Sequence, residues 1–332
     1  MGRTLIIAEA GVNHNGSIDT AKRLVDAAVD AGVDIVKFQT FDVGAITSKS
    51  AQMAKYQVEN TGQEKSQKDM LAELALSQEE FRELAGYCSS RGIEFLSTPF
   101  DIPSIAFLRS LNCRSWKVPS GEITNYPYLV EIARTHQDII LSTGMSTVDE
   151  VCDAVELLKS NGAGNITLLH CTTQYPTPYE DVNLRAMLTL GDEFGLPIGY
   201  SDHTKGIEVP VAAVAMGATV IEKHFTLDRN MEGPDHKASL EPDELKSMVE
   251  SIRNIEAALG TGEKKPAEVE LANKKAARKS IVAARPIHKG EVLTEENITT
   301  KRPGTGVNPM QWPAVIGSRA IRDFDEDELI EV

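Results

Sequence analysis

Short apolar segments alternate with helical segments over most of this chain, and this alternation is the feature that most limits its possible folds. Each apolar segment has the length of a strand. Strict alternation of strands and helices is typical of a parallel sheet covered by helices. The eight predicted strands are Leu5–Val12, Val33–Gln39, Ile93–Ser97, Ser115–Val118, Asp138–Leu141, Ile166–Leu169, Pro197–Tyr200 and Thr219–Ile221.

The number of these units predicts how the sheet closes. Eight strand–helix units within residues 1–259 match the size of a (β/α)₈ barrel, about 250 residues. The predicted fold class is therefore α/β, a (β/α)₈ TIM barrel. A doubly wound sheet is the alternative, because strand spacing alone does not prove closure. No G-x-G-x-x-G follows the first strand, which argues against a dinucleotide-binding fold.

Two parts of the chain depart from the alternation. Thr40–Leu76 is polar and too long for a simple connection, so we expect a lid or binding loop there. Residues 260–275 are charged and contain Gly and Pro, which predicts a linker. Residues 276–332 then have short strand-like segments, Ser280–Ala283 and Glu291–Leu293, and form a small β-rich domain with little core of its own.

Charge and cysteine content restrict the partners and the compartment. The net charge of −15 disfavours nucleic acid and anionic membranes, and an anionic substrate needs local cations. The N-terminal apolar run is too short for a signal peptide, and no segment has the length of a membrane span. The four cysteines form no CxxC pair, so we expect reduced thiols and a cytoplasmic protein.

Two histidines follow neighbouring predicted strands in the stretch Leu196–His236. His203 belongs to Ser-Asp-His after one strand, and His224 to Glu-Lys-His after the next. Ligands bind at the carboxyl ends of parallel strands, and neutral imidazole suits a divalent transition metal. We therefore expect a metal or catalytic site there, with His203 an exposed residue at a strand end. The alternative is two unrelated histidines packed under loops.

Polar residues follow the other predicted strands and would share one rim of the barrel. Lys37 and Lys117 among hydroxyl side chains suit a substrate that carries phosphate and carboxylate. The alternative is that both lysines only pair with nearby carboxylates. Glu9 and Glu122 would bind sugar hydroxyls or move protons, or would simply pair with the lysines. The whole rim comprises Glu9, Lys37, Gln39, Thr98, Lys117, Ser120, Glu122, Ser142, Thr173, Tyr175, Ser201, His203, Glu222, His224 and Asp235.

A series of motifs in order along the chain resembles the bacterial sialic acid synthase family (N-acetylneuraminate and legionaminate synthases). The motifs are IIAEAGVNHNGS, VKFQTF, FLSTPFD, WKVPSGEITNYPYL, IILSTGM, LLHCTTQYPTPYEDVNL, GYSDHT, IEKHFTLD, GPDHKAS, RKSIVA, IHKGEVLT and TTKRPGTG. They cover essentially the whole chain. The resemblance implies a (β/α)₈ barrel with a C-terminal antifreeze-like (SAF) domain.

The resemblance also implies an activity. Family members join phosphoenolpyruvate to the open-chain aldehyde of an N-acetylmannosamine-type sugar, with C–O cleavage and release of phosphate. They require a divalent metal, Mn²⁺ above all, with Mg²⁺ or Co²⁺ as alternatives. The family's metal ligands match His203 and His224.

The remaining roles are also carried over by resemblance. The residues that match phosphoenolpyruvate ligands are Lys37, Thr98, Lys117, Ser120, Ser142 and Ser201. Those that match sugar-side or acid–base residues are Glu9, Gln39, Glu122, Tyr175 and Asp235. Arg302 matches an arginine that contacts the N-acetyl group in a neighbouring subunit, which implies a domain-swapped homodimer. Thr173 departs from the asparagine of several members, and a hydroxyl offers one donor where an amide offers two.

Three alternatives remain open on the sequence. The first keeps the chemistry but uses a 2,4-diacetamido-trideoxymannose and makes legionaminic acid. The second is a metal-dependent aldolase on the same barrel. The third, suggested by the small domain alone, is a carbohydrate- or ice-binding protein without catalytic activity.

Overall fold

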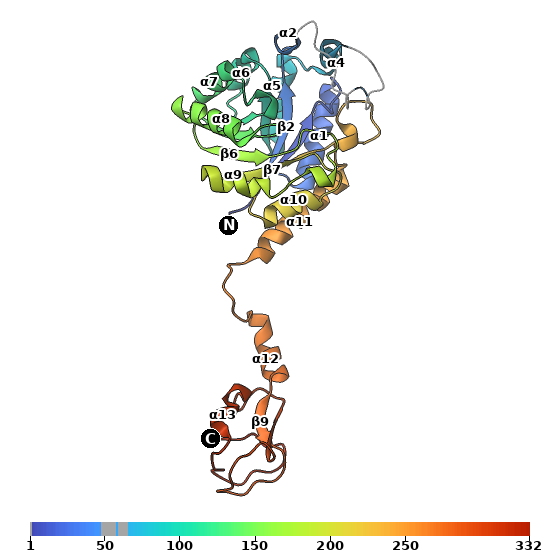
Figure 1. Cartoon of the computed structure of the whole chain (residues 1–332). Helices are drawn as coiled ribbons and strands as arrows, with labels where there is room; N and C mark the ends of the chain where they lie inside the picture. The colour runs from blue at the N-terminus through green and yellow to red at the C-terminus, as the bar shows by residue number, and fades with distance from the viewer. Residues whose placement is uncertain (1, 48–57, 59–65) are drawn as a thin grey trace. The chain divides into compact units, whose positions relative to one another are not determined.

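The computed structural model describes residues 2–47, 58 and 66–332. The chain divides after Gly260 into two compact units, the second of which is Thr261–Val332. The first unit is a barrel of parallel strands with helices on its outside (Figure 1). Among the described residues the barrel has eight strands: β1 (Leu5–Gly11), β2 (Ile35–Thr40), β3 (Glu94–Pro99), β4 (Ser115–Val118), β5 (Asp138–Ser142), β6 (Ile166–His170), β7 (Ile198–Asp202) and β8 (Val220–His224).

The order of the strands shows a near-closed barrel rather than an open doubly wound sheet. Hydrogen bonds join the strands in the order β3-β2-β1-β8-β7-β6-β5-β4, and each of these pairings is parallel. The two end strands, β3 and β4, also lie against each other. Strands that are neighbours in the sheet are consecutive in the chain, and β1 lies beside β8. This is the topology of a (β/α)₈ barrel. The predicted fold class is confirmed.

Helices cover the outer face of the barrel. They are α1 (Ile18–Ala31), α5 (Gln78–Arg91), α6 (Ile102–Arg109), α7 (Tyr126–Ala133), α8 (Val148–Ser160), α9 (Ala186–Phe194), α10 (Glu208–Ala215) and α11 (Pro242–Leu259). Two more helices, α2 (Val43–Ile46) and α4 (Gln67–Leu74), lie between β2 and α5 in the chain. Side chains at their N-termini stabilise several of these helices. Asp101 accepts from the backbone N–H of Ser104 at the start of α6, and Thr147 forms a capping box with Glu150 at the start of α8.

The segment between β2 and α5 differs from the prediction. Thr40–Leu76 was expected to be a long polar loop, but it contains helices α2 and α4. These two helices lie near the end of β2 in Figure 1. Met70 and Leu74 of α4 are buried and pack with Val12. The part of the predicted lid at residues 48–57 and 59–65 lies outside the described residues.

Two layers of apolar side chains explain how the strands position a site. Outward-facing residues such as Ile6 and Val36 pack against the helices in the main core. Inward-facing residues fill the barrel interior. The interior cluster comprises Ile7, Ile35, Leu96, Ile140, Leu169 and Val220. Because strand side chains alternate, the residue two positions after each of these also faces inward, nearer the carboxyl end.

The second unit is small and contains a two-stranded antiparallel sheet. Strand β9 (Ser280–Ala283) pairs with β10 (Ile298–Lys301), and helices α12 (Leu271–Ala277) and α13 (Trp312–Val315) belong to the same unit. The strand-like segment Glu291–Leu293 forms no strand, but Val292 makes an isolated antiparallel bridge with Arg319. A core of its own contains Ile281, Leu293 and Phe324. None of the described helices of the chain is long and apolar enough to cross a membrane.

Candidate active site

A cavity of about 370 Å³ opens at the carboxyl ends of the barrel strands. The alternation of side chains brings polar residues there. Glu9 follows Ile7 of the interior core by two positions and is paired in register with both Lys37 and His224. The cavity contains all the predicted site residues of the barrel: Glu9, Lys37, Gln39, Thr98, Lys117, Ser120, Glu122, Ser142, Thr173, Tyr175, Ser201, His203, His224 and Asp235.

Two lysines and two glutamates form a buried charge cluster at the floor of the cavity. Lys37 Nζ lies 2.8 Å from Glu9 Oε2 and 3.6 Å from Glu222 Oε2. Lys117 Nζ lies 3.8 Å from Glu222 Oε1. All four side chains are at most 5% exposed. Both lysines therefore have the carboxylate partners that the sequence left as an alternative to substrate binding.

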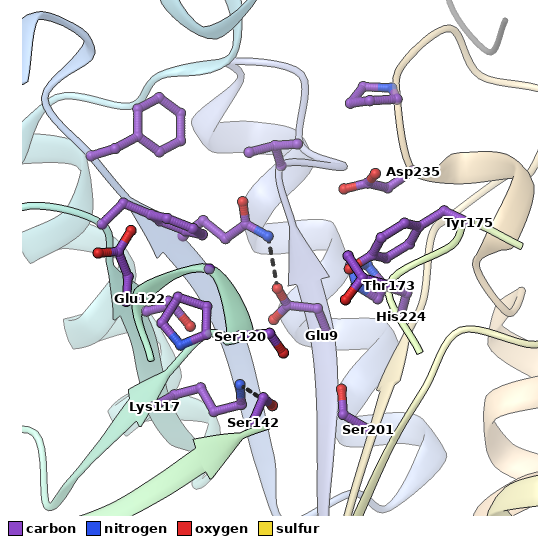
Figure 2. A pocket seen from close by; sticks show the side chains of 18 of the residues that line it. Glu9, Lys117, Ser120, Glu122, Ser142, Thr173, Tyr175, Ser201, His224 and Asp235 are labelled. Atoms are coloured by element: carbon purple, nitrogen blue, oxygen red, sulfur yellow. Dashed lines mark hydrogen bonds between the residues drawn. The ribbon is translucent and has the colours of Figure 1, made fainter. Parts of the chain in front are cut away.

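Hydroxyl groups complete the floor. Lys37 donates to Thr98 Oγ1 at 3.0 Å, and Lys117 donates to Ser142 Oγ at 2.7 Å. Figure 2 shows Lys117 and Ser142 together below Glu9, with Ser201 on the other side. Among the described residues the only ion pair of Lys117 is the distant one with Glu222, so its ammonium is the less neutralised of the two. An anionic group of a substrate would find both charge and oriented hydroxyls at this place.

The protonation of the cluster follows from burial and from the neighbouring charges. Burial acts to raise the pKa of Glu222, but attraction to Lys117 and Lys37 outweighs it and lowers that pKa to about 2. Burial raises the pKa of Glu9, and Lys37 only partly opposes this. Burial lowers the pKa of Lys117, while attraction to Glu222 opposes it. Glu222 is thus the fixed anion of the cluster, and Glu9 is the carboxylate that more readily holds a proton.

Glu222 was not among the residues to which a catalytic or binding role was assigned. The sequence placed it on the rim, beside His224, but strand position alone did not reveal its partners. The structure pairs it with both lysines and with Ser201, whose hydroxyl donates to Glu222 Oε1 at 2.9 Å. The signal that could have found it is the register of β7 with β8, in which Ser201 opposes Glu222.

His203 and His224 lie together on one side of the cavity. Their ring centroids are 5.5 Å apart, and the Tyr175 ring lies 4.2 Å from His203. His203 Nδ1 lies 2.7 Å from the carbonyl oxygen of Thr172. Because a carbonyl only accepts, Nδ1 carries the hydrogen and Nε2 keeps its lone pair. The expectation that His203 is exposed is wrong, because it is only 5% exposed.

This pair fits a divalent metal ion. Burial lowers the pKa of His203 and, together with repulsion from His203, that of His224, so both imidazoles are neutral as ligands must be. His224 Nδ1 is buried and has no hydrogen-bond partner among the described residues. No cluster of three or more His, Cys, Asp or Glu suited to a metal occurs in the described part of the chain. Two imidazoles would leave the other coordination positions to water and substrate.

Asp235 lies on the same side of the cavity as Tyr175 and His224, opposite Glu122 (Figure 2). Burial and the nearby Glu9 raise the pKa of Asp235 to about 7. Its loop is tied to the loop after β1. Asn15 Nδ2 donates to the carbonyl of Glu232, and His236 Nε2 lies 3.2 Å from Asn15 Oδ1. A carboxyl that titrates near neutrality can give or accept a proton during a reaction.

A second group of small polar side chains lies against Gly144. The backbone N–H of Gly144 donates to Ser120 Oγ at 2.9 Å, and Ser120 Oγ lies 3.2 Å from Cys171 Sγ. A Cβ at Gly144 would lie 2.5 Å from Thr173 Oγ1. Thr173 Oγ1 is buried without a hydrogen-bond partner among the described residues. Thr173, the residue that departs from the family pattern, therefore has an oxygen available to a ligand in the cavity.

Arg302 belongs to the second unit, where its side chain is exposed and its Nε donates to the carbonyl of Ala277 at 3.0 Å. The role in a neighbouring subunit's site that the resemblance implies for Arg302 stays a prediction.

Comparisons with known proteins agree along the whole chain. The NeuB family matches residues 24–264, and the SAF domain matches residues 278–331. The chain is 51% identical over 332 residues to N,N'-diacetyllegionaminic acid synthase of Campylobacter jejuni, which covers 99% of both chains. It is 49% identical over 318 residues to N,N'-diacetyllegionaminic acid synthase of Legionella pneumophila, covering 95% of this chain and 89% of the relative.

A solved structure supports the same comparison in three dimensions. The N-acetylneuraminic acid (sialic acid) synthetase from Leptospira borgpetersenii, crystallised in complex with citrate, matches with a TM-score of 0.72 at 35% identity. The match covers 82% of this chain and 90% of that chain.

Proposed function

The chain belongs to the NeuB family of sialic and legionaminic acid synthases, and on this basis we propose that it condenses phosphoenolpyruvate with an N-acetylated aminosugar in its aldehyde form. The products are a nonulosonic acid and phosphate. A C–C bond forms between the methylene carbon of phosphoenolpyruvate and the aldehyde carbon. Water adds to C2 of the former phosphoenolpyruvate, and the C2–O bond to phosphate breaks.

One observation carries this proposal: a single cavity contains both a buried cationic floor and a pair of neutral histidines. Lys37 and Lys117 suit the phosphate and carboxylate of phosphoenolpyruvate. The hydroxyls of Thr98 and Ser142 orient the same oxyanions. Because the rest of the protein is strongly acidic, these buried lysines supply the local cations that such a substrate needs.

We propose that His203 and His224 hold the divalent metal, with Mn²⁺ the first choice. Bound there, the ion would act as a Lewis acid that polarises the aldehyde oxygen. Tyr175 packs against both histidine rings and restricts their orientation. Glu9, with its raised pKa, is placed to exchange a proton with the attacking water, and Asp235 to exchange one with the sugar.

The preferred sugar is the 2,4-diacetamido-2,4,6-trideoxymannose that leads to legionaminic acid, rather than N-acetylmannosamine. Support comes from the two relatives named N,N'-diacetyllegionaminic acid synthase, at 51% and 49% identity. The solved sialic acid synthetase is less similar, at 35%. The four cysteines are free, which fits a reducing compartment and hence cytoplasmic synthesis.

The experiment that tests the function is direct. The purified protein is incubated with phosphoenolpyruvate, Mn²⁺ and each of the two sugars in turn, and phosphate release and product mass are measured. We expect phosphate only when both substrates are present, with a product mass equal to the sum of the sugar and pyruvic acid. Product formation from free pyruvate without phosphoenolpyruvate would instead indicate an aldolase.

We further propose that the active enzyme is a homodimer in which Arg302 of one chain completes the cavity of the other. Support comes from the charges of the two units. Residues 261–332 have equal numbers of basic and acidic side chains, so the net charge of −15 belongs to residues 1–260. The second unit has basic residues close together in the chain, Lys274, Lys275, Arg278 and Lys279, and Arg302 bonds to the backbone of Ala277 beside them. Such a group of cations is suited to an acidic partner surface.

Complementation tests the shared site. Inactive His203→Ala and Arg302→Ala chains are co-expressed with different tags, and mixed dimers are isolated through both tags. One of the two cavities in a mixed dimer then has both residues, so about half of the activity should return. Mixed dimers that stay inactive would show that each cavity is completed within its own chain.

A further inference from the structure

One side of the cavity is apolar, in contrast to its charged floor. We call it the apolar wall and define it as Val12, Phe41, Met70, Leu71, Leu74 and Phe100, all of which line the cavity. These residues come from the ends of β1, β2 and β3 and from helix α4. Binding of phosphoenolpyruvate by the charged and hydroxyl groups of the floor does not require such a surface.

The apolar wall is a packed surface. Val12, Met70 and Leu74 are each less than 9% exposed and form a cluster with Phe41 and Leu71. Met70 and Leu74 are four residues apart in α4 and therefore share one face of the helix. The Phe41 and Phe100 rings meet edge to face, with centroids 6.5 Å apart. These contacts within the apolar wall fix its shape without a ligand.

The order of strands separates the two phenylalanines of the apolar wall from the histidines. Phe41 and Phe100 follow β2 and β3, whereas His203 and His224 follow or end β7 and β8. Val12 follows β1, which lies between these two groups and pairs with β8. In the proposed reaction the aldehyde carbon must lie near both the histidines and the methylene carbon of phosphoenolpyruvate. A sugar chain that extends from there across β1 would place its far end against the wall.

We infer that the apolar wall determines sugar specificity by selecting a substrate with methyl groups, rather than hydroxyls, at its distal end. This inference rests on the proposed function. N-acetylmannosamine has hydroxyls on C4 and C6, whereas the trideoxy sugar has an acetamido group on C4 and a methyl group on C6. A hydroxyl placed against this wall loses water without gaining a partner. A methyl group in the same place gains from burial.

The size of the effect is limited by the chemistry of an apolar surface. Such a site prefers a methyl-bearing substrate but rejects a hydroxyl analogue only by about 10- to 100-fold. The wild-type ratio of kcat/KM for the two sugars should therefore lie in that range at saturating phosphoenolpyruvate. The wall should not change the KM for phosphoenolpyruvate, because the lysines and hydroxyls that bind it lie on the floor.

Two variants test the apolar wall. Met70→Gln keeps the length of the side chain and adds an amide, and Phe100→Tyr keeps the ring and adds a hydroxyl. Each should lower the ratio of kcat/KM for the trideoxy sugar over N-acetylmannosamine by about tenfold. Phe100 is half-buried, so its variant preserves the test if Met70→Gln does not fold. Met145→Gln is the matched control. Met145 lines the same cavity after β5 and is 70% exposed.

The outcomes separate this inference from the proposed function. The role of the wall in specificity is supported if the ratio of kcat/KM for the two sugars falls in the wall variants but not in Met145→Gln. The KM for phosphoenolpyruvate should stay unchanged in all of these variants. A wild-type ratio near one, or folded wall variants that keep the wild-type ratio, overturns it while the synthase activity stands. An equal fall in the Met145→Gln control also overturns it. If neither sugar releases phosphate from phosphoenolpyruvate, the proposed function itself fails.

Discussion

Lys223 Nζ lies 2.5 Å from Asp202 Oδ2, and both side chains are fully buried. Asp202 immediately precedes His203 and Lys223 immediately precedes His224, and the two lie on the neighbouring strands β7 and β8. The same ammonium donates to the carbonyl of Thr204, in the segment that follows His203. This ion pair therefore ties together the two chain segments that place His203 and His224.

Loss of this lysine should destabilise the barrel strongly. Lys223→Met leaves the buried Asp202 carboxylate without its partner, which typically costs about 3–5 kcal/mol. Urea unfolding measures the change. The matched control is Lys22→Met, which removes an ion pair with Glu83 on the surface, where both partners are partly exposed and the loss should be far smaller. Similar losses in the two variants would contradict a special role for the buried pair.

Removal of metal should abolish turnover. A chelator is expected to eliminate phosphate release, and added Mn²⁺ to restore it, because His203 and His224 are neutral, buried and partly unpaired. Isothermal titration should detect one Mn²⁺ per wild-type chain and none in His224→Ala. Full turnover by metal-free protein would remove the metal from the mechanism. Since His203 is buried, its alanine variant is checked for folding by circular dichroism before its activity is interpreted.

A methyl group at Gly144 should disrupt the binding of phosphoenolpyruvate. The added Cβ would lie 2.5 Å from Thr173 Oγ1 and 2.9 Å from both Cys171 Sγ and Ser120 Oγ. At least one of these groups must move, so we expect the KM for phosphoenolpyruvate to rise at least tenfold in Gly144→Ala.

Gly86→Ala provides the control for this substitution. Gly86 lies within α5, and nothing would be within 4 Å of its Cβ. This variant should keep its KM and gain about 0.4–1 kcal/mol of stability. An unchanged KM in Gly144→Ala would show that Ser120, Cys171 and Thr173 do not contact the substrate.

Asp235 should make both activity and stability depend on pH near neutrality. Its folded-state pKa is raised from 3.8 to about 7, first by burial and then by Glu9. The folded protein therefore holds a proton that the unfolded chain releases, and stability falls as the pH rises from about 4 to about 7. Above pH 7 the folded protein contains an ionised buried carboxylate.

The variant Asp235→Asn tests this assignment. Its free energy of unfolding should lose the decline between about pH 4 and pH 7, and its pH profile of kcat/KM should lose a step near pH 7. Urea unfolding at pH 5 and pH 8, with initial rates over the same range, measures both. The assignment would be refuted if the variant kept the wild-type decline in stability.

Much of the fold and the membership of the barrel site followed from local pattern. Period-two alternation explains why Ile7 and Glu9 face the same interior, one in the core and the other in the cavity. Strand ends therefore predicted which residues would meet. The structure adds the charge partners: Glu222 contacts both Lys37 and Lys117 from a strand that is distant in sequence. The spacing of strands along the sequence does not predict which side chains contact one another across the barrel.

The sequence by itself determined the alternation of strands and helices, the rim residues and the strand positions of the two histidines, because short-range periodicity and turn residues encode these. Only the tertiary structure decided the burial of His203, the pairing of Glu222 and the helix α4 within an apparently polar segment. Met70 and Leu74 became core residues because Val12, more than fifty positions earlier in the chain, covers them. Burial and ionisation depend on neighbours that only the closed barrel brings together.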